Sequence, residues 1–116
     1  MNVVEEARNF FQKALTIESG KKLLSEGRKK ILFRNSDGPS FVVEFAVDSI
    51  SVSEGNTNDI DLGVESTSEN YSKIFRGILS PGTAYHNRSL YFDGIPFKGY
   101  PWLTHLIKLI QDEGEK

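Results

Sequence analysis

Apolar positions at the start of the chain recur every three or four residues. Val3, Ala7, Phe10, Phe11, Ala14 and Leu15 fall on one side of a helix drawn through residues 3–15. A second, shorter helix is predicted over residues 17–26, with Leu23 and Leu24 directed inward and Gly27 ending it. The chain is therefore expected to begin with two helices that each present an apolar face to a core.

The hydrophobic period changes to two after Gly27. The positions predicted to point inward are Ile31, Phe33, Phe41, Val43, Phe45, Val47, Ile50, Val52, Ile60, Leu62 and Val64. Turn-forming residues separate these segments, most clearly Asn35-Ser36-Asp37-Gly38-Pro39. This alternation predicts four strands joined by short turns, in an antiparallel meander with one polar face.

Two abbreviated helices are predicted next. Residues 66–69 supply helix-starting side chains, and Tyr71, Ile74, Phe75 and Ile78 follow at helical spacing. Gly77 interrupts this first helix. Ser80 is a suitable cap for a second one that begins at Pro81, with Ala84 and Tyr85 inward.

The last elements are a strand and a helix. Leu90 and Phe92 alternate as a fifth strand, and a wide apolar face is formed by Trp102, Leu103, Leu106, Ile107 and Ile110. The last helix is expected to start near Trp102, because Pro96 and Pro101 disfavour an earlier start. The whole pattern predicts one α+β domain over residues 1–116, in which helices cover one face of a five-stranded, largely antiparallel sheet.

The composition of the chain argues against several classes of function. The 116 residues are 38% hydrophobic and carry a net charge of −2, which argues against a general nucleic-acid binder. Cysteine is absent, which removes disulfides, thiol catalysis and cysteine metal sites. A secretory signal needs a continuous apolar run, and Glu5 and Glu6 interrupt the N-terminal segment. These features favour a cytoplasmic location.

Charge is unevenly spread along the chain. Six Lys/Arg and one acid lie between Lys21 and Arg34, whereas seven acids and no base lie between Glu44 and Glu69. The simpler interpretation is two solvated faces. The sharper one is a basic edge that contacts anionic lipid headgroups through Lys21, Lys22, Arg28, Lys29 and Lys30.

No set of catalytic residues stands out. His86 and His105 each lack a second ligand at metal-binding spacing, and Asp59 and Asp61 are typical of a solvent-facing strand. No phosphate-binding loop is present. We therefore expect no catalytic residue, metal or cofactor. The large aromatic content fits either a filled core or the wall of a hollow, and composition does not separate these.

The order of elements from Asp59 to Gly94 resembles the sterol carrier protein type 2 domain, the nonspecific lipid-transfer family. The matching residues are Asp59-Ile60-Asp61-Leu62, Tyr71, Ile74-Phe75, Gly77, Leu79-Ser80-Pro81, Ala84-Tyr85 and Leu90-Tyr91-Phe92-Asp93-Gly94. The resemblance extends over about residues 3–112. It implies an apolar tunnel between sheet and helices, with the helix break at Gly77 and Pro81 leaving the gap. His86-Asn87-Arg88 and residues 95–101 depart from the family pattern near the expected mouth.

The resemblance also implies a ligand: a fatty acyl chain, acyl-CoA, a sterol or a phospholipid. The expected lining residues are those that the periodicity directs inward and that also match the family's pattern of elements. They are Phe33, Phe45, Phe75, Leu79, Tyr85, Leu90, Trp102, Leu106 and Ile110. The main hypothesis is non-enzymatic binding and transfer of this apolar ligand. The alternatives are an interaction module with a filled core that forms a homodimer through its last helix, and an accessory domain for an enzyme of lipids or alkyl sulfates.

Overall fold

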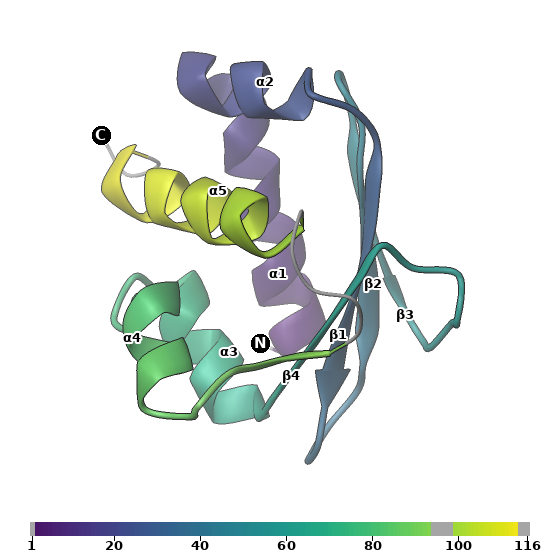
Figure 1. The fold of residues 1–116 in the computed structure, drawn as a ribbon, viewed down its shortest axis with the longest axis vertical. Coiled ribbons are helices and arrows are strands. Elements are labelled where there is room, and N and C mark those ends of the chain that lie inside the picture. Colours follow the sequence, from purple (N-terminus) through teal and green to yellow (C-terminus); the bar gives the residue numbers. More distant parts are fainter. Residues whose placement is uncertain (1, 94–98, 114–116) are drawn as a thin grey trace.

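A computed structural model describes residues 2–93 and 99–113, which form a sheet with helices packed on one side of it (Figure 1). The helices are α1 (Val3–Gln12), α2 (Glu18–Leu24), α3 (Ser68–Phe75), α4 (Pro81–His86) and α5 (Gly99–Glu113), and the short 3-10 helix η1 (Lys13–Thr16) joins α1 to α2. The strands are β1 (Lys29–Asn35), β2 (Phe41–Phe45), β3 (Ile50–Glu54), β4 (Leu62–Ser66) and β5 (Tyr91–Asp93). The predicted α+β class, with helices over one face of a five-stranded sheet, is confirmed.

The strand order is β3-β2-β1-β4-β5. Three of the four strand pairs are antiparallel, but β1 and β4 run parallel, with Ile31 opposite Leu62. The predicted four-strand meander is therefore wrong at its fourth strand, although the sheet is largely antiparallel. Side chains alternate in both kinds of pairing, so alternation alone does not identify a strand's neighbour.

Two hydrogen bonds fix the start of β4 beside β1. The Asp61 amide donates to the Lys30 carbonyl oxygen at 2.8 Å, and the Lys30 amide donates to a carboxylate oxygen of Asp61 at 2.7 Å. The strand itself begins at Leu62, so Ile60 lies before it. Val47, predicted to face inward, follows the end of β2 and is 60% exposed, because the chain turns there between β2 and β3.

The apolar face of the sheet is the one that the helices cover. The register places Phe33 beside both Phe41 and Val64, and all three side chains are buried. The opposite face is less polar than predicted, since Leu32 points to that side and is fully buried. On the covered face, the buried side chains form one apolar layer between the sheet and the helices.

Helix α1 connects the edge strand β3 to the helical layer. The Arg8 guanidinium donates to the Val52 carbonyl oxygen at 3.0 Å, and the Gln12 amide donates to that of Ile50 at 2.6 Å. Because the sheet ends at β3, these contacts occupy acceptors on a strand with a neighbour on one side only. On α1, Glu6 accepts from the Ser72 hydroxyl of α3 at 2.9 Å.

The break between α3 and α4 follows the prediction. Gly77 has φ +78, and its amide donates to the Ile74 carbonyl oxygen, while the Ile78 amide reaches back to that of Lys73. This is the glycine-terminated Schellman arrangement. Ile78 was expected to continue the apolar stripe, but it lies beyond the break and is 69% exposed.

The start of α4 also follows the prediction, whereas that of α5 does not. Ser80 accepts a hydrogen bond from the Thr83 amide at 3.2 Å, and Pro81 takes the first helical position. Helix α5 begins at Gly99 rather than near Trp102. Pro101 lies in its first turn, where a missing N–H leaves no intrahelical bond unmade. The prediction concerning Pro96 lies outside the described residues.

Candidate apolar ligand site

Most of the predicted lining residues lie in one apolar cluster. Seven of them are buried between the sheet and the helices: Phe33, Phe45, Phe75, Leu90, Trp102, Leu106 and Ile110. Leu79 is partly buried and packs against the same cluster. The structure thus brings these side chains together, and their role as the lining of a tunnel stays a prediction.

The centre of this cluster contains a ring that the predicted lining omitted. Phe11 of α1 is fully buried, and its ring centroid lies 5.2 Å from that of Phe45, 5.7 Å from that of Phe33 and 5.6 Å from that of Phe75. The helical period of residues 3–15 had placed Phe11 on the inward stripe, which is the signal that could have identified it. Because these rings are in contact, a ligand at this point would have to displace Phe11 or its neighbours.

Trp102 anchors the first turns of α5. Its indole N–H donates to the Leu23 carbonyl oxygen of α2 at 3.1 Å, and its ring meets that of Phe45 edge-on at 5.1 Å. The ammonium group of Lys29 lies 4.4 Å from the centre of the indole ring, a cation–π contact. Trp102 therefore joins α5, α2 and the sheet.

Tyr71 places a polar group inside the same layer. Its hydroxyl donates to the Arg34 carbonyl oxygen at 2.7 Å, so the buried group has a partner. Burial raises the pKa of the Tyr71 phenol well above its usual range; the negative charge of Glu65 adds to the rise, and Arg34 opposes it. The phenol is therefore neutral at physiological pH and contributes a ring to the apolar wall.

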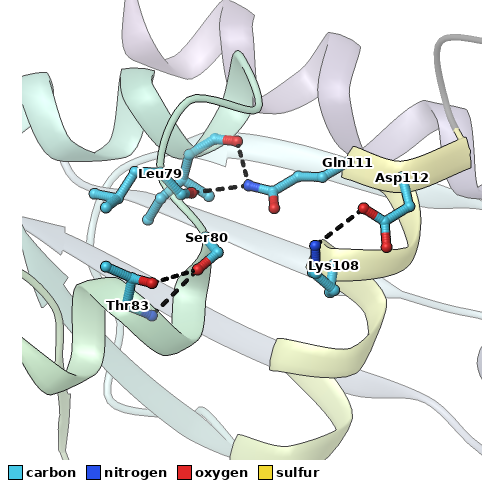
Figure 2. Close-up of polar contacts among 7 residues, drawn as sticks. Leu79, Ser80, Thr83, Lys108, Gln111 and Asp112 are labelled. Atoms are coloured by element: carbon cyan, nitrogen blue, oxygen red, sulfur yellow. Dashed lines mark hydrogen bonds and ion pairs between the residues drawn. The ribbon is translucent and has the colours of Figure 1, made fainter.

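Gln111 ties α5 to the connection between α3 and α4 (Figure 2). Its side-chain amide donates to the carbonyl oxygens of Ile74 and Leu79, each at 2.9 Å. Helix α4 has only six residues, of which Pro81 and Ala84 are buried. Little apolar burial thus holds α4 in place, and the Gln111 bonds restrain the segment that leads into it.

Tyr85 is not directed inward as predicted. It is 44% exposed, because the neighbouring Ala84 takes the buried position on this short helix. Its ring lies 5.6 Å from that of Phe92. Together with His86, Arg88, Leu90 and Tyr91 it borders a surface hollow of about 320 Å³. The departure from the family pattern at residues 86–88 therefore lies at this hollow.

A second surface groove lies between α4 and α5. It has a volume of about 400 Å³ and is lined by Ser80, Pro81, Gly82, Pro101, Thr104, His105 and Lys108. Among residues 2–93 and 99–113 there is no group of three His, Cys, Asp or Glu side chains able to hold a metal ion. Over the same ranges, no helix has both the length and the apolar character to cross a bilayer.

The architecture is that of an α+β domain in which a mixed sheet and a set of short helices enclose one apolar layer. It is the fold of the sterol carrier protein 2 domains. The UbiJ-SCP2 ubiquinone synthesis protein has a TM-score of 0.71 at 15% identity, covering 89% of this chain and 90% of that chain. The sterol carrier protein domain 2 of Helicoverpa armigera has a TM-score of 0.71 at 15% identity, covering 97% and 91%.

Another solved structure in the comparison has the same fold. The palmitated SCP2L2 from Aedes aegypti matches with a TM-score of 0.63 at 17% identity, covering 95% of each chain. No protein-family model matches the sequence, and no curated protein sequence matches it. The resemblance found in the order of the elements is thus confirmed by structure, at the level of the fold.

Proposed function

We propose that this protein binds a long-chain apolar ligand reversibly between its sheet and its helices and carries it without chemical conversion. The observation that carries the proposal is the apolar layer itself: seven of the nine expected lining residues are buried together there, in a fold shared with sterol carrier protein 2 domains. A fatty acyl chain, a sterol or another lipid would fit this layer through shape and apolar contact, since the side chains of the cluster are hydrophobic.

The expected affinity is modest. Each buried methylene contributes about 0.8 kcal/mol, so a chain of about fourteen methylenes offers roughly 11 kcal/mol. Association costs about 4–15 kcal/mol. Moving packed rings such as Phe11 and Phe75, whose centroids are 5.6 Å apart, costs more. Binding in the micromolar range or weaker follows, which suits a protein that must release its ligand.

Membrane contact, if the ligand comes from a bilayer, would involve fewer cations than the sequence suggested. Lys29 lies against the Trp102 ring, and Lys30 pairs with Glu44 at 3.6 Å and Asp59 at 3.7 Å. Lys21, Lys22 and Arg28 are the exposed members of the predicted basic edge. Flotation with phosphatidylserine vesicles tests this contact: the protein should float with them, and neutral vesicles should leave it behind.

The direct test of the function is chemical extraction of the purified protein, followed by mass spectrometry of the extract and native mass spectrometry of the intact protein. We expect a lipid in the extract and a protein mass raised by one ligand. A stable homodimer without ligand would instead support the filled-core interaction module. A ligand-free monomer that also fails to take up added lipid would overturn the proposal.

A further inference from the structure

We propose that the groove between α4 and α5 receives the carboxylate end of a single-chain fatty acid, with the tail directed between the two helices. This inference rests on the proposed function and assigns a particular place, and a contact for the carboxylate, to one of the ligands proposed there. The groove has a volume of about 400 Å³. That space admits the head and first methylenes of one chain, and the rest of the ligand requires the apolar layer.

The walls of the groove suit a hydrocarbon chain. Pro81 and Gly82 line it from α4, and Pro101 lines it from the first turn of α5. None of these side chains carries a donor or an acceptor. The same two helices bury Ala84 and Leu106 completely, so a chain that passes between α4 and α5 leads to the core. The groove is thus a surface opening with apolar contacts from Pro81, Gly82 and Pro101, and the hydroxyl-bearing Ser80 and Thr104 also line it.

The rim supplies the charge that selects a carboxylate. Lys108 and His105 both line the groove from α5, and none of the described residues that line it is acidic. The Lys108 ammonium pairs with Asp112 at 3.0 Å, one turn further along α5 (Figure 2). An ammonium ion has three donors, so one ion pair leaves it able to donate to a carboxylate. Its aliphatic stem extends the apolar wall.

Helix α4 is the side of the groove that can yield. It buries two residues only, and Gly77, with φ +78, forms the bend in the segment before it. The Gln111 amide restrains that segment through the Leu79 carbonyl oxygen. A small outward movement of α4 would widen the groove, and none of the described residues that line the groove belongs to a strand.

Gly82 provides a way to fill the groove. A side-chain carbon added at Gly82 meets no heavy atom within 4 Å, so a larger residue can be accommodated in the folded protein. Gly82→Leu should place a branched side chain in the space intended for the ligand. A matched pair of lysines tests the rim: Lys108 pairs with Asp112 and Lys73 pairs with Glu69, both at four-residue spacing on a helix. Lys73 does not line the groove.

The experiment is calorimetric titration of the delipidated protein with dodecanoic acid and, separately, with dodecanol. Gly82→Leu should weaken binding of both ligands at least tenfold. Lys108→Met should weaken binding of the acid about threefold to fivefold and leave that of the alcohol unchanged, and Lys73→Met should change neither. Circular dichroism checks that each variant is folded. If Gly82→Leu does not fold, Lys108→Met still tests whether the rim contacts the carboxylate.

Two results would overturn the inference, and they are distinguishable. If the unmodified protein binds both ligands and the Gly82 and Lys108 variants bind them equally well, the ligand enters elsewhere, and the proposed function stands. If the unmodified protein binds neither ligand, the proposed function fails together with the groove.

Discussion

The side-chain nitrogen of Gln111 lies 2.9 Å from the carbonyl oxygen of Leu79, which joins the last helix to the segment between the two shortest ones (Figure 2). The same nitrogen donates to the Ile74 carbonyl oxygen near the end of α3. One amide therefore satisfies two acceptors at a point where the helical ladder has ended. Gln111 is therefore a polar link between α5 and the α3–α4 connection.

Gln111→Leu should lower the free energy of unfolding by about 1–2 kcal/mol, because it removes two hydrogen bonds while nearly keeping the side-chain volume. Urea denaturation measures this loss. Hydrogen exchange at the Ile78 and Leu79 amides should also become faster, since their segment loses its restraint. The neighbouring Asp112→Asn is the control and should change stability by less than about 0.5 kcal/mol. Equal stability of Gln111→Leu and the unmodified protein would show that this link contributes nothing.

Trp102 should be more sensitive to truncation than to replacement by another ring. Trp102→Ala is expected to lower the free energy of unfolding by about 3–5 kcal/mol, as for large buried aromatics. Trp102→Phe keeps the contact with Phe45 but loses the bond to Leu23, and should cost about 1–2 kcal/mol. Thermal or urea unfolding of both variants checks the order, and an equal loss in the two would contradict the anchoring role of the indole N–H.

Tyr71 should make stability fall in alkaline solution. Below about pH 10 the phenol is protonated in both the folded and the unfolded states, so it adds no pH dependence. Above that pH the unfolded state releases the proton, whereas burial holds the folded-state pKa higher, so the free energy of unfolding decreases as pH rises. Urea unfolding between pH 8 and 11 should show a shallower decline for Tyr71→Phe. Parallel curves for the two proteins would rule out this source.

Gly77 and Gly82 both have room for an added Cβ atom, but they differ in backbone conformation. Gly77 has φ +78 at the end of α3, while Gly82 lies within α4. Gly77→Ala should therefore lower the free energy of unfolding by about 1 kcal/mol. Gly82→Ala should raise it by about 0.5–1 kcal/mol through helix propensity. Chemical denaturation of the pair provides the measurement, and a stabilising Gly77→Ala would contradict the left-handed cap.

The local signals along the chain predicted most of the elements. The caps at Ser80 and Pro81 and the break at Gly77 act within a few residues, so sequence alone placed them correctly. The pairing of β4 with β1 depends on a contact between Lys30 and Asp61, which are thirty-one residues apart, and no periodicity reports it.

The sequence indicated which residues form the apolar cluster, but not how their rings are arranged in it. Alternation and helical spacing predicted that Phe33, Phe45 and Leu106 share one layer. These patterns carry no information on whether the rings are in contact. Phe11 occupies the middle of the layer because α1 crosses over it, which is a tertiary relationship. The prediction that Tyr85 points inward was wrong for a related reason. A helix of six residues buries only a narrow stripe, and Ala84 occupies it.

Trp102 can report directly whether a hydrocarbon chain enters the layer between the sheet and the helices. It is the one tryptophan in the sequence and is buried against Phe45. The measurement is Trp102 fluorescence during titration of the delipidated protein with a fatty acid brominated along its chain, since bromine quenches on contact. We predict quenching that saturates at one ligand per protein, with no quenching by the unbrominated acid. Undiminished emission from a folded protein at saturating ligand would contradict it.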